Sequence, residues 1–516
     1  MIMKTMPIRW CHFLMAMVLS AALLLPVPAV ASVQKDGVHI TIFHTNDMHG
    51  RVLESDDNGK SIGMKWIAAA IWQQKEADSD TLAFDAGDTL HGMPLINASK
   101  GENMARLMNL SGYDGMTPGN HDFNYGAVQL QKLAGMLNFP MLSANLVDRD
   151  EQGYVFRPYK SFELNGVRIA VFGLSTPETA YKTNKVNVEL VKFLNPVDTA
   201  KKLVPKLRKN HDVVIGLMHM GLDASSEYTS ARIAKEVPGI DLILDGHSHT
   251  KLQKPEKVGK TLICQTGARG DFLGRVELIV RNHKLRKVKS VLLDRAAIVN
   301  EVEGPDEGVS EALQAIEADN QKTVGKVVTQ SPRELSSARE LVRTRESELG
   351  NLTADALRWA AQADIGLANG GGLRANLPAG AVTQGDLWKI FPFGNTLKRV
   401  EISGATVQKV LEHSVEYVPG AFGGFMDVSG LTFTLDIAAP AGRRVSNVKV
   451  AGVPLDNQRL YQVAVSDFTA AGGDGYDMLK NAKVTGEFGT LEEVFSQYLN
   501  QKGIGDIATG RIQIKK

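Results

Sequence analysis

The segment Val38-His-Ile-Thr-Ile-Phe-His-Thr-Asn-Asp-Met-His-Gly50 decides how this chain is interpreted. Its first six residues are typical of a strand, and the segment ends on two potential metal ligands, Asp47 and His49. Alternate side chains of an extended segment point to the same side, so this Asp-x-His spacing lets both face one ligand.

Strand-like and helix-like segments alternate through the first half of the chain. The strand-like runs cover residues 38–43, 81–84, 168–174, 212–218, 239–244 and 260–264, and residues 64–76 and 126–137 have helical patterns. Such alternation predicts an α/β layered domain.

Polar clusters follow most of these strand-like runs. They are Asp47-Met48-His49-Gly50, Gly87-Asp88, Gly119-Asn120-His121-Asp122, His219 and Gly246-His247-Ser248-His249. Ligands of open α/β sheets bind beyond the carboxyl ends of the strands, so we expect the clusters to converge on one edge.

The chemistry of these clusters suits a pair of divalent metal ions, because they offer imidazole nitrogens together with carboxylate and amide oxygens. Asp88 is the natural candidate for a carboxylate that bridges the two ions. Two such ions can clamp a phosphate and lower the pKa of a bound water molecule, which then attacks the phosphorus in line. Taken singly, each cluster is more often a turn, a cap or a core histidine. The ordered set of five predicts a dinuclear site.

Composition excludes several classes of protein. The chain has 516 residues, of which 43% are hydrophobic and 22% charged, and its net charge is +1. This near-neutral balance argues against a nucleic-acid-coating protein. The sequence has no internal run of about 18 apolar residues, which excludes a multi-span membrane protein. The length predicts at least two domains.

The N-terminus has the pattern of an export signal. Lys4 and Arg9 precede an apolar stretch over residues 13–25 and a small-x-small site that ends at Ala31. A buried helix or a membrane anchor is the alternative interpretation. Cleavage after Ala31 would remove Cys11 and leave Cys264 alone, so no internal disulfide is expected in a periplasmic or secreted protein.

The second half has an α+β pattern. Residues 352–361 and 405–417 are helix-like, and residues 398–402, 431–437 and 460–465 are strand-like. We therefore predict a signal peptide over residues 1–31, a metal-binding domain over 32–300, a linker with its own helix over 301–330, and a second domain over 331–516.

The order DxH, GD, GNHD, H and GHxH resembles the signature of the calcineurin-like metallophosphoesterases. His44-Thr45-Asn46-Asp47 and the motifs of the second half narrow the resemblance to the 5′-nucleotidase family, whose bacterial members include periplasmic UDP-sugar hydrolases. The resemblance implies a four-layer first domain, a β-sandwich flanked by helices, and an α+β substrate-binding domain at the C-terminus.

The resemblance also implies roles for individual residues. Asp47, His49, Asp88 and His249 would hold one metal ion, and Asp88, Asn120, His219 and His247 the other. Zn, Mn, Co and Fe all fit these ligands. His121 would be the catalytic histidine near the phosphate. One position departs from the family: Asn124 replaces an Asp that often completes a His–Asp dyad, and an amide can orient the imidazole but cannot raise its pKa as a carboxylate would.

The second half supplies candidate contacts to the organic part of a substrate. Residues 369–372 are Asn-Gly-Gly-Gly, and Phe468 precedes a second glycine cluster. The resemblance implies that Phe425 and Phe468 hold a nucleobase, that Asp474 contacts the ribose, and that Arg374 and Asn395 contact the substrate. Catalysis would then require the two domains to meet.

The expected function is release of phosphate from nucleoside 5′-monophosphates, with nucleoside di- and triphosphates and UDP-sugars as further substrates. A 2′,3′-cyclic-nucleotide phosphodiesterase with 3′-nucleotidase activity is the alternative within enzymes, and Asn124 supports it. A nucleotide-binding protein that has lost catalysis is the alternative outside enzymes. The expected partner is a nucleotide, with no nucleic-acid polymer and no membrane anchor after signal cleavage.

Overall fold

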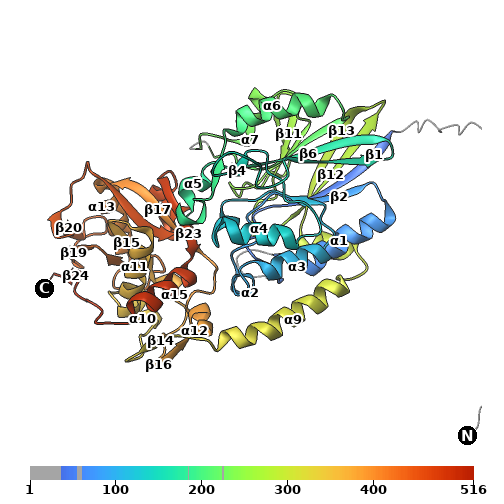
Figure 1. The fold of residues 1–516 in the computed structure, drawn as a ribbon. Helices are drawn as coiled ribbons and strands as arrows, with labels where there is room; N and C mark the ends of the chain where they lie inside the picture. The colour runs from blue at the N-terminus through green and yellow to red at the C-terminus, as the bar shows by residue number, and fades with distance from the viewer. Residues whose placement is uncertain (1–36, 55–60, 184, 224–225, 516) are drawn as a thin grey trace, which may run out of the picture. The chain divides into compact units, whose positions relative to one another are not determined.

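The computed structural model describes residues 37–54, 61–183, 185–223 and 226–515. The predicted signal peptide therefore lies outside the described residues. Residues from Gly37 onward form one compact unit (Figure 1). Across the described part of the chain, no helix combines the length and the apolar character needed to cross a bilayer.

The first half contains two sheets. The first has the strand order β13-β12-β1-β2-β3 and the second the order β10-β11-β9-β8-β6-β5. The strands of the first sheet are β1 (Val38–Thr45), β2 (Thr81–Asp85), β3 (Gly115–Met116), β12 (Leu273–Arg281) and β13 (Lys284–Leu293). Those of the second are β5 (Tyr159–Leu164), β6 (Val167–Ser175), β8 (Val213–His219), β9 (Leu242–Leu244), β10 (Glu256–Val258) and β11 (Thr261–Cys264).

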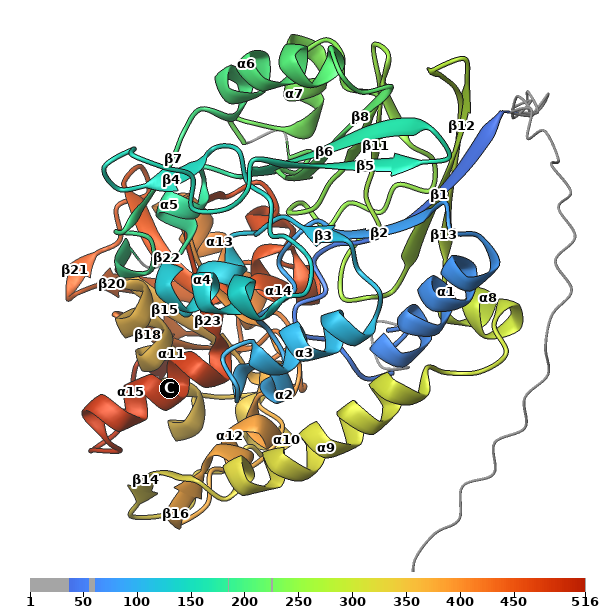
Figure 2. The ribbon, with the colours of Figure 1, turned by 45° about the vertical axis from the view of Figure 1, so that its right-hand side comes forward.

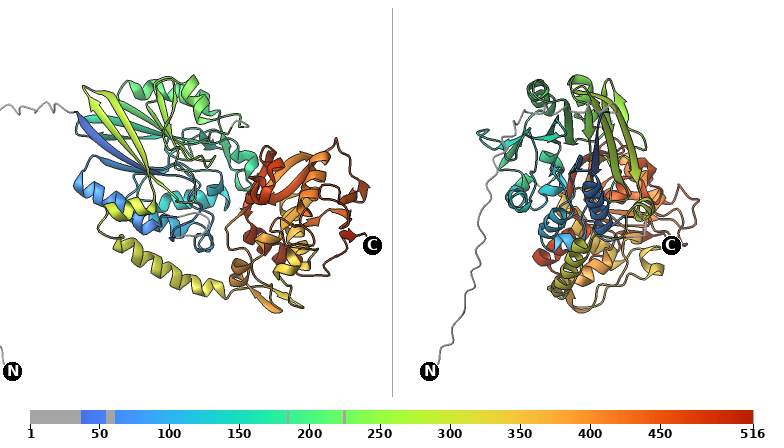
Figure 3. Two further views of the ribbon diagram at one scale, coloured as in Figure 1. Left: turned by 180° about the vertical axis from the view of Figure 1, so that it is seen from behind. Right: turned by 90° about the vertical axis from the view of Figure 1, so that its right-hand side faces the viewer.

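The two sheets share one apolar core, which includes Ile42 and Phe84 from the first sheet and Val171 and Ile215 from the second. Helices cover the outer faces (Figures 1 and 3). The helices of this half are α1 (Met64–Ala77), α2 (Pro94–Asn97), α3 (Glu102–Leu110), α4 (Ala127–Met136), α5 (Thr179–Lys182), α6 (Pro196–Arg208), α7 (Ser230–Glu236) and α8 (Arg295–Glu301). The predicted four-layer arrangement is confirmed.

Strand burial explains why the central strands are so apolar. Every residue of β8 and β9 is buried, as expected for parallel strands covered on both faces. Strand β5 at the sheet edge alternates between exposed and half-buried residues instead. A short antiparallel pair, β4 (Leu146–Asp148) and β7 (Val191–Phe193), completes this half.

The helix predicted within the linker over residues 301–330 is present as α9 (Glu307–Val324). Its side chains Val309, Leu313 and Ile316 are buried in the core that contains α1 and α3. Figure 2 shows α9 running beside α2 and α3. The helix is therefore an integral part of the metal-binding half rather than a free connection.

The second half contains a five-stranded sheet, a four-stranded sheet and a two-stranded ribbon. The strands are β14 (Val327–Ser331), β15 (Ile365–Asn369), β16 (Gly380–Thr383), β17 (Thr396–Ser403), β18 (Met426–Ser429), β19 (Leu431–Leu435), β20 (Val445–Val450), β21 (Val453–Pro454), β22 (Leu460–Ser466), β23 (Lys483–Thr490) and β24 (Ile512–Ile514). The helices are α10 (Arg339–Val342), α11 (Glu348–Ala361), α12 (Gln384–Ile390), α13 (Gly404–Ser414), α14 (Asp467–Ala470) and α15 (Leu491–Lys502).

Candidate active site

The predicted ligands meet because the strands that precede them end together. Strand β1 is parallel to β2 with Thr45 opposite Asp85, and β6 is parallel to β8 with Ser175 opposite His219. The loops after β1, β2 and β9 carry Asp47, Asp88 and His247 respectively, and His219 is the last residue of β8. The expected convergence on one edge is therefore found.

Two groups of side chains could each hold a metal ion: Asp47, His49 and His249, and Asp88, His219 and His247. Within each group, the candidate ligand atoms lie within 4.8 Å of one another. The groups adjoin, because His219 Nε2 is 3.2 Å from Asp88 Oδ2 and 3.9 Å from Asp47 Oδ1. The arrangement suits a pair of ions.

Buried atoms without hydrogen-bond partners support metal binding. Among the described residues, the Nε2 of His219, the Nδ1 of His49 and the Oδ1 of Asn120 are buried and make no hydrogen bond. The Nδ1 of His219 faces the carbonyl oxygen of Ala86 at 2.7 Å. That contact places a proton on Nδ1 and leaves Nε2 free to bind a metal, as second-shell partners of ligand histidines commonly do.

The backbone of the site is held in an unusual conformation. Five of the seven predicted ligands adopt positive φ angles: Asp47 (51°), His49 (46°), Asp88 (55°), His247 (82°) and His249 (53°). Non-glycine residues are uncommon in this region, and such strain gathers at functional sites. The folded core therefore imposes the positions of these side chains.

The pKa values of the buried acidic and histidine side chains at the site depend on one another. Burial alone would raise the pKa of Asp88, but the neighbouring His219 and His121 hold the pKa of that carboxyl well below its usual range. Burial acts to lower the pKa of His219, but the nearby Asp88 outweighs burial and raises that pKa to about 10, so a metal ion that binds Nε2 would displace a proton from it. Burial and the nearby His249 hold the pKa of His49 well below its usual range.

The catalytic candidate His121 lies beside these groups. Its backbone N–H donates to Asp88 Oδ1 at 2.7 Å, and its ring is 5.2 Å from that of His49. The amide nitrogen of Asn124 is 3.1 Å from His121 Nδ1, so Asn124 occupies the expected orienting position.

Two carboxylates from the second half reach into the metal-binding half. Glu487 on β23 accepts a hydrogen bond from Asn120 Nδ2 at 3.1 Å, and its Oε2 is 3.2 Å from His121 Nε2. Glu493 on α15 lies 2.8 Å from the Nε2 of His91. Glu487 stands in no motif, and Glu493 belongs only to the capping box Thr490-x-x-Glu493 that begins α15. Their contacts with the metal-binding half depend on packing between the halves, so sequence patterns gave no signal for them.

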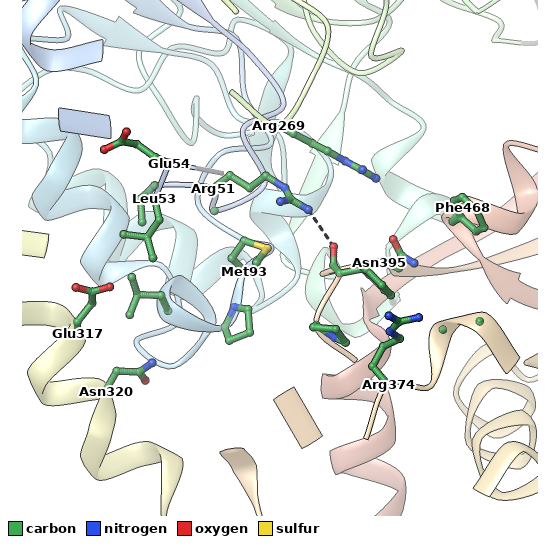
Figure 4. A pocket seen from close by; sticks show the side chains of 18 of the residues that line it. Arg51, Leu53, Glu54, Met93, Arg269, Glu317, Asn320, Arg374, Asn395 and Phe468 are labelled. Atoms are coloured by element: carbon green, nitrogen blue, oxygen red, sulfur yellow. Dashed lines mark hydrogen bonds between the residues drawn. The ribbon is translucent and has the colours of Figure 1, made fainter. Parts of the chain in front are cut away.

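A cavity of about 1430 Å³ contains most of the predicted substrate residues (Figure 4). Arg374, Asn395, Phe468 and Asp474 line it. The Phe468 side chain is 40% exposed, so one ring face is accessible. Arg374 stacks over the ring of Phe393 with 5.7 Å between the guanidinium carbon and the ring centre.

Phe425 differs from the expectation. Its side chain is fully buried in the core that contains Val410 and Tyr476, and it does not line the cavity. The neighbouring Gly423 lines the cavity through its backbone. The chain thus turns the Phe425 ring toward the core, and the predicted pair of aromatic clamps is reduced to Phe468.

The cavity also has lining residues that the sequence patterns did not single out. Arg51, Arg269 and Arg343 add three guanidinium groups to that of Arg374. Arg51 could have been found, because it lies four residues after Asp47 in the same loop. Its Nη2 donates to the carbonyl oxygen of Phe393 at 3.0 Å, a contact between the two halves (Figure 4).

Comparison with known proteins supports the same interpretation. A family model described as calcineurin-like phosphoesterase matches residues 40–251, and one described as 5′-nucleotidase, C-terminal domain, matches residues 324–481. Protein UshA of Yersinia enterocolitica is 30% identical over 515 residues, which cover 91% of this chain and 92% of that protein. The chain belongs to the 5′-nucleotidase family.

Two further similarities bear on this 5′-nucleotidase family member. Trifunctional nucleotide phosphoesterase protein YfkN of Bacillus subtilis is 30% identical over 530 residues, covering 93% of this chain but only 35% of that protein. The solved NAD nucleotidase NadN of Haemophilus influenzae shares the fold, with a TM-score of 0.75 and 21% identity over 93% of this chain and 100% of that one. The protein is thus a phosphoesterase of the 5′-nucleotidase type, a hydrolase.

Proposed function

We propose that this enzyme releases phosphate from nucleoside 5′-monophosphates, with nucleoside di- and triphosphates and UDP-sugars as further substrates. The observation that carries the proposal is the presence, in one chain, of two adjoining ligand groups and a cavity lined by arginines, an accessible phenylalanine and Asp474. A metal site accounts for hydrolysis of a phosphate ester, and the cavity accounts for a nucleoside on that ester.

Two divalent ions would be held by seven side chains. Asp47, His49, Asp88 and His249 would bind one, and Asp88, Asn120, His219 and His247 the other, with Zn, Mn, Co and Fe as the candidate metals. When bound, such ions neutralise phosphate charge and lower the pKa of a water molecule. Glu178, whose Oε2 is 3.1 Å from His247 Nε2, would fix the orientation of that imidazole.

The side chains around the ions would position the phosphate. His121 would lie beside the phosphate or the leaving group, where an imidazole N–H stabilises developing negative charge. In the present arrangement Glu487 contacts the N–H groups of Asn120 and His121. A phosphate that reaches these donors would have to displace that carboxylate.

The nucleoside would be held by the second half. Phe468 would stack on the base, Asp474 would accept a hydrogen bond from the ribose, and Arg374 and Asn395 would contact the polar groups of the substrate. None of the seven candidate ligands lines the described cavity. We therefore infer that the halves move about a hinge close to the linker helix α9, and that turnover requires the cavity to approach the ligand groups. A crosslink that locks the present arrangement should abolish nucleotide turnover.

A second activity, hydrolysis of 2′,3′-cyclic nucleotides followed by release of the 3′-phosphate, is favoured by Asn124. Similarity to a relative named a trifunctional nucleotide phosphoesterase adds support. Phosphate release from AMP, UDP-glucose and 2′,3′-cyclic AMP, each measured with several metals, separates the two. Faster turnover of AMP supports the main proposal, and turnover of the cyclic substrate alone overturns it in favour of the second. Recovery of intact AMP, with no substrate of the panel hydrolysed, would contradict both.

We also propose that residues 1–31 direct export to the periplasm or the medium. Expression of the full chain in a bacterial host, followed by fractionation and N-terminal sequencing, tests this. A mature N-terminus at Ser32 supports the proposal, and an intact N-terminus on protein retained in the cell contradicts it.

A further inference from the structure

The loop that carries Asp474 into the cavity has little conformational preference of its own. Residues 472–475, here called the Asp474 loop, are Gly-Gly-Asp-Gly, and Asp474 itself has a positive φ angle of 52°. Glycine populates many backbone conformations, and aspartate adopts this one only where its surroundings impose it. The Asp474 loop therefore depends on contacts from other elements for its shape.

His413, in the last turn of α13, makes such a contact, although neither the sequence motifs nor the proposed mechanism gives it a role. Its Nε2 lies 2.8 Å from the carbonyl oxygen of Asp474, and its Nδ1 lies 2.8 Å from Oε2 of Glu416. A carbonyl oxygen can only accept, so Nε2 has to donate to Asp474, and a ring that makes both contacts carries hydrogens on both nitrogens. The imidazole thus ties the Asp474 loop to α13.

Two aromatic side chains hold the His413 ring in place. The ring packs edge-on against Tyr476, with 4.7 Å between ring centres, and against Phe422, with 5.3 Å. Tyr476 is fully buried, and its hydroxyl donates to the carbonyl oxygen of Gly424. A Cβ atom at residue 475 would lie 3.0 Å from His413 Nε2, so Gly475 leaves room for the ring to reach the loop. Packing therefore fixes the imidazole relative to the Asp474 loop.

The Asp474 loop supports two of the predicted substrate contacts. Asp474 and Phe468 both line the cavity. A Cβ atom at residue 473 would lie 2.5 Å from ring carbons of Phe468, so this ring rests directly on the backbone of Gly473. A shift of the loop would thus move the Asp474 carboxylate and the support of the Phe468 ring together. His413 does not line the cavity, so it can act on a substrate there only through the loop.

We propose that His413 is a positioning residue for nucleoside binding: by holding the Asp474 carbonyl, it keeps the Asp474 carboxylate and the Phe468 ring in place for the ribose and the base. This inference rests on the roles proposed above for Asp474 and Phe468. Without the imidazole, the carbonyl loses its donor and the glycine-rich loop samples other conformations. Nucleoside binding then weakens, while the metal ligands and His121 in the other half keep their positions.

Steady-state kinetics with two phosphate esters tests the inference on the Mn²⁺-loaded full-length enzyme. AMP contains a base and a ribose, whereas glycerol phosphate contains neither. His413→Leu removes both hydrogen bonds of the ring and should raise KM for AMP about tenfold, with kcat for AMP and both constants for glycerol phosphate within about twofold of the wild type. A side chain needed only for folding would affect both esters alike.

Two further variants show whether the hydrogen bond to the loop is what matters. In His413→Gln the amide nitrogen can take the place of Nε2 and donate to the Asp474 carbonyl, so KM for AMP should return to within about threefold of the wild type. His211→Leu is the matched control. His211 is also half-buried and has a partner at each ring nitrogen, the Ser161 hydroxyl and the Leu207 carbonyl, but it precedes β8 and does not line the cavity. The control should match the wild type for both esters.

Calorimetric titration with adenosine separates this inference from the proposed function, because it needs no turnover. The Kd of adenosine should rise about tenfold in His413→Leu and recover in His413→Gln, whereas the Kd of inorganic phosphate should stay unchanged. If the wild type hydrolysed no nucleotide, the proposed function would fail, and the adenosine affinities would still decide the positioning role. A wild type that binds no adenosine would overturn the inference.

The kinetic outcomes decide the role of His413 in the same way. An unchanged KM for AMP in His413→Leu, equal losses for AMP and glycerol phosphate, or no recovery in His413→Gln would overturn the positioning role. Thermal melting shows whether each variant is folded. If His413→Leu does not fold, Glu416→Ala takes its place, because the Glu416 side chain is 40% exposed and contacts the other ring nitrogen. Its KM for AMP should rise about threefold, and a wild-type value would then overturn the proposal.

Discussion

Replacement of Gly119 by alanine tests how tightly the ligand groups are built. A Cβ atom at residue 119 would lie 2.2 Å from Asp88 Oδ1 and 2.6 Å from His219 Cε1. Real Cβ contacts essentially never fall below 3.0 Å, so both ligands, or the backbone at residue 119, must move. The GNHD motif therefore needs its glycine because two ligands approach the backbone there.

The expected magnitude follows from that overlap. Asp88 has to shift by about 1 Å, and a misplacement of about 1 Å in an active site can cost about 100-fold in rate, or about 2.7 kcal/mol in activation free energy. Since Asp88 would bridge the two ions, we also expect metal affinity to fall by about 10- to 100-fold.

The assay is phosphate release from AMP together with calorimetric titration of the metal-free protein with Mn²⁺. Gly135→Ala is the matched control, because the Cβ added there, in helix α4, would have no neighbour within 4 Å. The control should keep its activity and gain up to about 1 kcal/mol of stability, since alanine favours helix. Wild-type turnover and Mn²⁺ affinity in Gly119→Ala would refute the reasoning.

Three further predictions address other parts of the account. Asp88→Asn should lose metal binding and turnover together, whereas His121→Ala should lose turnover by about 100-fold or more and keep its metal; retention of the wild-type rate in Asp88→Asn would count against the bridge. Phe468→Ala should raise KM for AMP about tenfold through lost base stacking and leave hydrolysis of glycerol phosphate unchanged, so an equal effect on both esters would exclude a base contact. Burial raises the pKa of the Asp427 carboxyl to about 8, so between about pH 4 and 8 the folded state binds one proton more than the unfolded state and loses stability as pH rises. The melting temperature of Asp427→Asn should therefore fall less across this range than that of the wild type. Parallel curves of melting temperature against pH would contradict the raised pKa.

Most of the metal-binding half could be predicted from sequence. The ligands follow strands whose apolar runs are continuous, and parallel neighbours such as β6 and β8 must end at the same sheet edge. That topology brings Asp47 and Asp88 together at the end of the first sheet, and the packing of the two sheets against each other places His219 beside them. The left-handed backbone at Asp47 and Asp88 was not predictable, because aspartate adopts it only where the surrounding core imposes it.

The contacts between the halves were beyond sequence reasoning. Glu487 and Glu493 lie on β23 and in the first turn of α15, where acidic residues are ordinary, and only tertiary packing brings them to His121 and His91. Phe425 shows the reverse case. A motif position predicted a ring for the substrate, but the turn before β18 directs that ring into the core.

The most direct test of the central claim is anomalous diffraction from crystals of the Mn²⁺-loaded enzyme. The account predicts two anomalous peaks, one among Asp47, His49 and His249 and one among Asp88, His219 and His247, with Asp88 touching both. A single peak, or peaks away from these side chains, would contradict a dinuclear phosphoesterase site at this edge of the sheets.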